Sequence, residues 1–159
     1  MALDQEAYQR GTSVYFPDRA IPMLPEALSN GICSLNPLED RLTKTVQMEI
    51  DEKGRVLKSR FFNSVIRSYA RMTYTDVRRI LVDRDRECID RYRLLVDQFK
   101  RMEELALLLW ENRKARGSLD FDLPEAEIVI DLQGMPENIV RAERSIAHRI
   151  IEEFMIAAN

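Results

Sequence analysis

The segment from Arg10 to Leu42 constrains the fold most, because proline and glycine punctuate it so densely that its backbone has few alternative paths. Thr12 to Phe16 has the composition of a short β-strand, and Pro17 ends this strand because proline has no backbone N–H to donate. Pro22 and Pro25 then favour an extended link, which opens at Pro25 into a helix. The sequence therefore predicts a strand, a proline-bounded link and a short helix in this order.

The short helix after Pro25 is predicted to make one turn, from Glu26 to Ser29. Asn30-Gly31 follows it, and glycine often closes a helix by adopting a positive φ, so we expect Gly31 to do so. A further turn is predicted at Ser34-Leu35-Asn36-Pro37. These features describe local folding, and they carry no information about chemistry.

Two β-hairpins and one further strand are expected in the rest of the chain. The first hairpin joins Lys44 to Asp51 with Val56 to Val65 through a turn that contains Gly54, because apolar and polar residues alternate in the first of these runs. The second joins Glu127 to Leu132 with Ile139 to Ala142. Before it, Leu119, Phe121 and Leu123 alternate with aspartates, which is typical of a half-buried strand.

Helical periodicity is clearest from Cys88 to Arg116, where apolar residues recur every three or four positions until Gly117. The pattern predicts one amphipathic helix of about 40 Å, at 1.5 Å per residue. It is interpreted as a scaffold packed along a sheet, with a coiled-coil partner site as the alternative. Thr73 or Thr75 can cap a helix before it, and a last, largely apolar helix is predicted from about Glu143 to Asn159.

The predicted fold class is therefore α+β, with β-hairpins and short strands packed against a long amphipathic helix and a buried C-terminal helix. The length of 159 residues suggests one domain, and 45% hydrophobic with 32% charged residues is typical of a soluble globular protein. No apolar run approaches the length of a membrane span, so the expected location is the cytoplasm. Cys33 and Cys88 are expected to be free, buried thiols.

The last helix carries one polar stripe, made of His148, Arg149, Glu152 and Glu153. An unpaired buried ion is costly, so this stripe should face either a partner charge or a wet cavity. The residues alone leave two readings open: an i,i+4 ion pair of Arg149 with Glu153, or a functional cavity.

Other candidate residues are less specific from the sequence alone. Tyr74 and Phe121 fit core positions as readily as binding positions. His148 is the single histidine, which excludes a site of several histidines. Acidic residues gather near the second hairpin, where a solvated edge is favoured over a metal site: Asp120, Asp122, Glu125, Glu127 and Asp131.

Several strings in the chain stand in the order and nearly the spacing of a known family. They are RGTSVYFP, IPMLPE, LSNG, CSLNP, DRL, ARMTY, DFDLPEAEI and HRIIEEFMIAAN. Together they closely resemble the catalytic (RNB) domain of ribonuclease II and ribonuclease R, processive exoribonucleases that degrade RNA from its 3′ end. The resemblance covers only the middle of that domain, so residues 1–159 are predicted to be a partial RNB-type domain and Met1 a truncation or internal start.

The resemblance implies roles for three residues. Glu152 matches the glutamate that lines the family's catalytic cavity and helps to hold the RNA 3′ end. Tyr74 and Phe121 match aromatic residues that clamp the bases of the last nucleotides. Such stacking is tolerant of sequence and contributes about 1 to 3 kcal/mol per base. Tyr15 is expected near the RNA path, with no assigned role.

The family hydrolyses RNA to nucleoside monophosphates with Mg²⁺, which an aspartate cluster of the form DxxDARDxDDA holds. The present sequence contains no such string, and the family's downstream arginine motif is missing as well. We therefore expect Mg²⁺ to act in the parent enzyme and this chain to hold no metal and to be inactive alone.

The expected partners are single-stranded RNA, the missing parts of the same catalytic domain and flanking oligonucleotide-binding-fold domains, with no membrane. In the family, those flanking domains supply much of the affinity for RNA. A net charge of −3 on this chain is therefore compatible with an RNA-binding parent enzyme. The alternatives are a short non-catalytic module that binds RNA or a protein, and a helical scaffold.

Overall fold

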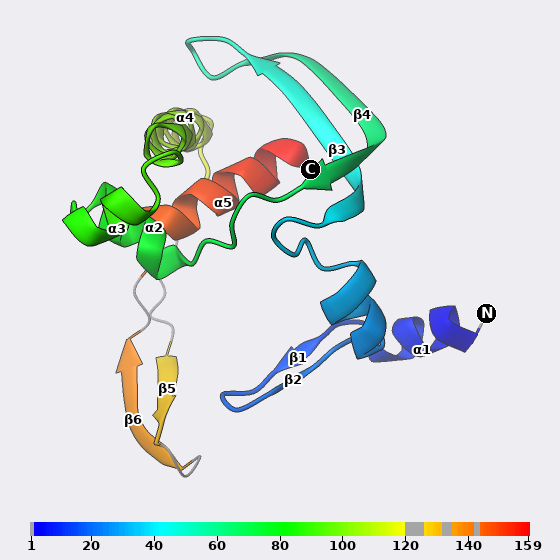
Figure 1. Ribbon diagram of the computed structural model, residues 1–159. Coiled ribbons are helices and arrows are strands. Elements are labelled where there is room, and N and C mark those ends of the chain that lie inside the picture. The colour runs from blue at the N-terminus through cyan, green and yellow to red at the C-terminus, as the bar shows by residue number, and fades with distance from the viewer. Residues whose placement is uncertain (1, 120–125, 132–134, 142–143) are drawn as a thin grey trace. The chain divides into compact units, whose positions relative to one another are not determined.

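The computed structural model describes residues 2–119, 126–131, 135–141 and 144–159, and it combines helices with antiparallel two-stranded sheets (Figure 1). This architecture confirms the predicted α+β class. The chain divides into two compact units, which are described separately. The first is Met1–Thr43, Asn63–Ala70 and Pro124–Ala142, and the second is Lys44–Phe62, Arg71–Leu123 and Glu143–Asn159.

The first unit begins with helix α1 (Ala2–Arg10), followed by strands β1 (Val14–Tyr15) and β2 (Ala20–Ile21). The two strands pair antiparallel, and the Phe16 N–H donates to the Arg19 carbonyl at 2.7 Å. Pro17 is the second residue of this turn, where its fixed φ is favourable. The strand before Pro17 is thus as predicted, whereas β2 was not predicted.

The short helix η1 (Ala27–Ile32) is a π-helical turn. It continues through Gly31, which does not have a positive φ, so the predicted closure by Gly31 is wrong. The wider turn closes by a bond from the Cys33 N–H to the Leu28 carbonyl, at 2.9 Å. Because this hydrogen bond spans five residues, from Leu28 to Cys33, Gly31 lies inside the helical turn rather than after it. Cys33 is exposed, contrary to the expected burial of both cysteines.

The first predicted hairpin is confirmed as β3 (Asp40–Ile50) with β4 (Val56–Arg67), and both strands extend beyond the predicted runs. Asp51 fixes its turn, because one carboxylate oxygen accepts from the backbone N–H groups of Lys53 (3.0 Å) and Arg55 (2.8 Å). The Arg55 N–H lowers the pKa of Asp51 below its ordinary value. Gly54 completes the turn with φ +71°.

The second predicted hairpin is confirmed as β5 (Ala126–Ile130) with β6 (Pro136–Arg141). Ile128 lies opposite Ile139, and the register shifts between Val129 and Ile130. Most of the strand predicted from Leu119 to Leu123 lies outside the described residues.

The described residues of the second unit form four helices, α2 (Tyr74–Leu81), α3 (Arg86–Arg91), α4 (Val96–Ala115) and α5 (Ile146–Ala158). The prediction of one helix from Cys88 to Arg116 is wrong, because the chain turns between α3 and α4. The turn allows α3 to lie against α2, where Arg79 pairs with Asp85 at 2.8 Å. Asp85 also caps α3, and the Cys88 N–H and Arg79 together lower the pKa of its carboxyl.

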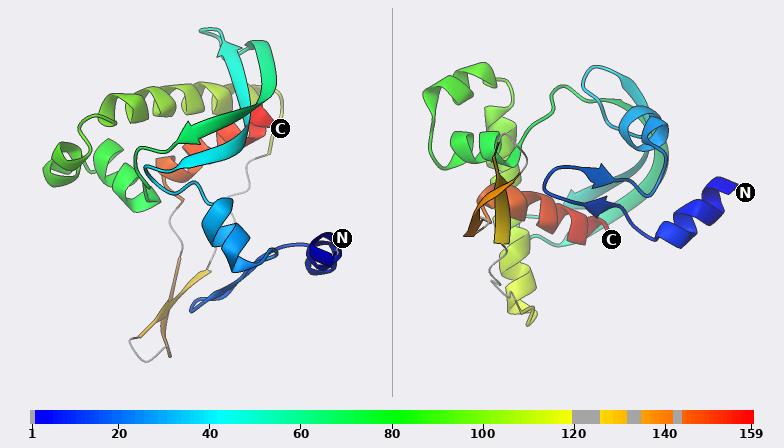
Figure 2. Two further views of the ribbon diagram at one scale, coloured as in Figure 1. Left: turned by 45° about the vertical axis from the view of Figure 1, so that its right-hand side comes forward. Right: turned by 90° about the horizontal axis from the view of Figure 1, so that it is seen from below.

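The core of the second unit is built by all four helices, with α5 lying against both α2 and α4 (Figures 1 and 2). Its buried side chains are Val77, Ile80, Cys88, Phe99 and Ala147. Burial raises the pKa of the Cys88 thiol. The predicted burial of the C-terminal helix is seen at Ala147 and Ile150, but it is wrong for Ile151, Met155 and Ile156, which are 40%, 60% and 45% exposed and lie on the outer side of α5. Within the described ranges, no helix is long and apolar enough to cross a membrane.

Substitution of Gly54 by alanine is expected to destabilise the chain by about 1 to 2 kcal/mol, because an L-residue is strained at positive φ. A Cβ there would also lie 3.0 Å from Leu108 Cγ. Gly31→Ala is the matched control, since Gly31 has an ordinary φ and open space around it. Urea melts of the two variants test this, and equal midpoints would contradict the turn geometry.

Candidate functional site

The first turn of α5 is fixed by contacts between Ser145 and His148. The Ser145 backbone N–H donates to His148 Nδ1 at 3.2 Å, and the Ser145 hydroxyl lies 3.0 Å from the same nitrogen. Histidine here takes the position that glutamate or glutamine has in a capping box. The imidazole ring of His148 is therefore held at the start of the helix.

Tyr74 stacks on this imidazole ring. It is the first residue of α2, which Thr73 caps by accepting the Asp76 N–H at 3.0 Å. The ring centroids of Tyr74 and His148 are 4.0 Å apart and their planes differ by 25°. Tyr74 is 46% exposed, so it is a surface residue with one ring contact rather than a core residue.

Glu152 follows His148 by one helical turn, so the two residues share one face of α5. Its side chain is 34% exposed and forms an ion pair with Arg144, and a longer one with Arg113 at 3.7 Å. Tyr74, through its stack on His148, and Glu152 thus lie at the same face of α5. Phe121, the third residue singled out in the sequence, lies outside the described residues.

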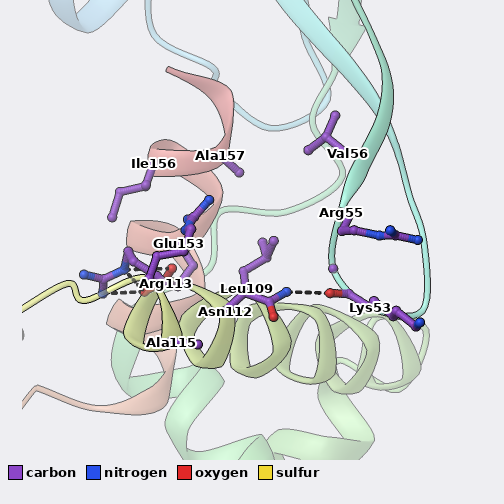
Figure 3. A pocket seen from close by; sticks show the side chains of 12 residues that line it. Lys53, Arg55, Val56, Leu109, Asn112, Arg113, Ala115, Glu153, Ile156 and Ala157 are labelled. Carbon is purple, nitrogen blue, oxygen red and sulfur yellow. Dashed lines mark hydrogen bonds and ion pairs between the residues drawn. The ribbon is translucent and has the colours of Figure 1, made fainter.

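Glu153 is in a different environment from its neighbour. It is 2% exposed, and Arg113 of α4 donates to its carboxylate from Nη2 at 2.7 Å and from Nε at 3.1 Å (Figure 3). Arg113 is 14% exposed and also donates to the Ser118 hydroxyl at 2.8 Å. Glu153 is therefore a structural residue, and among the described ion pairs its partner is Arg113 rather than the Arg149 of the i,i+4 reading.

Arg149 packs on an aromatic ring. Its guanidinium lies 4.1 Å from the centre of the Trp110 ring of α4, and the Lys114 ammonium lies 4.3 Å from the same centre. Both are cation–π contacts. The polar stripe of α5 thus divides into a buried ion pair, a half-exposed carboxylate and a cation on tryptophan.

Sequence reasoning missed Arg113 and Arg144, the two cations at Glu152. Arg113 lies 40 residues before Glu153 and carries no local signal of this pairing. The contact of Ser145 with His148 did have a signal, because their spacing is that of a capping box.

A groove of about 710 Å³ lies in the second unit between the β3–β4 turn, α4 and the end of α5 (Figure 3). Lys53, Arg55 and Arg116 line it, together with Arg113 and the Glu153 that Arg113 neutralises. The Asn112 side-chain amide donates to the Lys53 carbonyl and ties the turn to α4. Because Arg55 forms an ion pair with Asp51 at 2.7 Å, the positive charge of this wall comes mainly from Lys53 and Arg116.

No group of three or more histidine, cysteine, aspartate or glutamate residues is arranged to hold a metal ion within the part of the chain that the structure describes. Of the acidic cluster noted in the sequence, Asp120, Asp122 and Glu125 lie outside that part. The described residues thus do not fit a site for Mg²⁺.

Comparison with known families matches the whole chain, residues 1–159, to the RNB domain. The chain is 48% identical over 157 residues to ribonuclease R 1 of Lactococcus lactis and 44% identical over 157 residues to ribonuclease R of Escherichia coli. Each alignment covers 99% of the chain and 19% of the relative. The chain therefore belongs to the RNB domain family, and it spans about a fifth of the length of these relatives.

A solved structure shows the same fold. The chain superposes on RNase R of Mycoplasma genitalium, solved in complex with ribose-methylated single-stranded RNA, with a TM-score of 0.89 and 30% identity. The match covers 100% of this chain and 24% of that protein. The resemblance read from the sequence is thereby confirmed.

Glu153→Ala is expected to cost about 3 to 5 kcal/mol of stability, because the buried Arg113 guanidinium loses its close partner and keeps only the longer ion pair with Glu152, at 3.7 Å, and the hydrogen bond to Ser118. Glu152→Ala is the matched control: its carboxylate is partly exposed, and its loss leaves Arg113 paired with Glu153, so we expect about 0 to 1 kcal/mol. Denaturant melts of the two variants measure the difference. Equal losses of unfolding free energy in the two variants would contradict a structural role of Glu153 that Glu152 does not share.

Proposed function

We propose that the chain is the middle segment of the catalytic domain of an exoribonuclease that hydrolyses RNA processively from its 3′ end to nucleoside monophosphates. The face of α5 that carries Glu152 and the Tyr74–His148 stack contacts the last nucleotides of a single-stranded RNA. The observation that carries this proposal is an exposed aromatic ring of α2, Tyr74, stacked on His148 of α5, with the 34% exposed Glu152 side chain one helical turn after His148. The sequence identity of the chain to ribonuclease R supports RNA hydrolysis as the class of reaction.

The candidate residues have separate roles in this proposal. Tyr74 stacks on a base, and Phe121 clamps a second base, which suits an enzyme that accepts every nucleotide because all bases present a π-face. Glu152 accepts hydrogen bonds from the ribose hydroxyls of the 3′ end. Arg113 and Arg144 hold the Glu152 carboxylate in place through their ion pairs.

The sequence lacks the aspartate string that holds Mg²⁺ in the family, so the metal of the reaction is held, in this proposal, by another part of the parent enzyme. Mg²⁺ held there would supply an activated water and stabilisation of the leaving oxygen. This segment binds and orients the RNA. Its partners are the remaining parts of the catalytic domain and the flanking oligonucleotide-binding-fold domains, and its location is the cytoplasm.

A second candidate function is a non-catalytic module that binds RNA. The groove lined by Lys53, Arg55 and Arg116 favours it, because neutralised phosphates supply most of the affinity for nucleic acid. The positive charge of this groove is local, because the net charge of the whole chain is −3. The two candidates differ in whether the chain supports hydrolysis once the missing parts are supplied.

The isolated chain is expected to show no Mg²⁺-dependent nuclease activity, because its sequence lacks the aspartate string that holds the metal in the family. The same chain is expected to support hydrolysis when it replaces the matching segment of Escherichia coli ribonuclease R, to which it is 44% identical. Shortening of 5′-labelled single-stranded RNA, with and without EDTA, measures both. A folded but inactive chimaera would favour the non-catalytic module.

In that chimaera, Tyr74→Ala and Phe121→Ala are each expected to weaken binding of a short oligonucleotide by about 5- to 150-fold, which corresponds to the loss of one stacked base. Glu152→Ala is expected to slow hydrolysis strongly. All three variants should melt close to the parent chimaera. Much lower melting temperatures with unchanged binding and products would identify core residues instead.

A further inference from the structure

The Tyr74 ring has a stacking partner on α5. Tyr74 begins α2, and with 46% of its surface exposed it is not held by burial. Among the described residues, its stacking partner is His148, at 4.0 Å between ring centroids. A tyrosine ring has two faces, so the stack on His148 leaves the second face for another ring.

His148, in contrast, is firmly held. Ser145 contacts its Nδ1 from both the backbone N–H (3.2 Å) and the hydroxyl (3.0 Å). The neighbouring positions Ala147 and Ile150 are buried, which fixes the first turns of α5 against the core. The imidazole is therefore a rigid surface against which a less constrained ring can be aligned.

The same helix also carries Glu152, four residues after His148. Residues at this spacing have Cβ atoms about 5 to 6 Å apart on one helix face. If Tyr74 is aligned by His148, the ring that stacks on a base and the carboxylate that contacts the ribose keep a fixed separation. This separation is then set by α5 itself rather than by the loop before α2.

From these contacts we infer that His148 is a positioning residue, which holds the Tyr74 ring so that an RNA base completes a stack of three rings. The inference rests on the proposed function, because it requires Tyr74 to contact RNA. His148 acts through Tyr74 and does not itself touch the substrate. Its cap on α5 and its stack on Tyr74 are two separate contributions, and they can be separated by substitution.

Two substitutions at His148 each remove one contribution. His148→Gln keeps an acceptor for the Ser145 N–H, as glutamine does in a capping box, and removes the ring. His148→Phe keeps a ring for the stack and removes the acceptor. We expect His148→Gln to bind RNA about 5- to 150-fold more weakly, approaching Tyr74→Ala, without a loss of melting temperature. We expect His148→Phe to bind like the parent and to melt lower.

The experiment uses the chimaera with Escherichia coli ribonuclease R and 5′-fluorescein-labelled oligoadenylate, with anisotropy measured in EDTA so that the RNA is not cleaved. Thermal melts are measured on the same samples. Tyr74→Ala is the reference variant, and Tyr74→Ala combined with His148→Gln closes a double-mutant cycle. Because His148 acts through Tyr74, the double variant should bind no more weakly than Tyr74→Ala.

The possible results separate this inference from the proposed function. Normal binding by His148→Gln, beside weak binding by Tyr74→Ala, would overturn the positioning role and leave the proposed function intact. Weak binding by His148→Phe, or additive losses in the double variant, would also overturn it. Normal binding by Tyr74→Ala would instead remove the proposed contact with RNA, and the inference with it.

Discussion

The buried ion pair between Arg113 and Glu153 is the interaction on which the rest of the second unit depends. It joins α4 to α5 at a point where neither side chain has much access to water, so each charge needs the other. Arg113 uses its remaining donors on Ser118 and, at longer range, on Glu152. One guanidinium therefore links the packing of the unit to the partly exposed carboxylate proposed to contact RNA.

This link explains why two adjacent glutamates have different roles. On a helix, successive residues point about 100° apart, so Glu153 faces α4 while Glu152 faces the edge of the bundle. The same rotation places His148 on the face of Glu152, and Ala147 and Ile150 toward the core. The site thus follows from the orientation of α5, and contacts with α2 and α4 fix that orientation.

Sequence patterns predicted the features that depend on neighbouring residues: both hairpins, the Thr73 cap, and the end of α4 before Gly117. They failed where distant contacts decide. Periodicity runs unbroken from α3 into α4 because both helices face one core, so it could not reveal the turn between them. The pairing of Arg113 with Glu153 spans 40 residues and has no local signature. For the candidate site, the family strings pointed to Tyr74 and Glu152, while their surroundings required the structure.

Trp110 lies at the junction of α4 and α5. It is the single tryptophan of the chain, and the cations of Lys114 and Arg149 lie over its ring. One of these cations belongs to α4 and the other to α5. The indole emission of the protein therefore reports on the separation of these two helices, so the chain carries an intrinsic optical probe of the helix pair beside its candidate site.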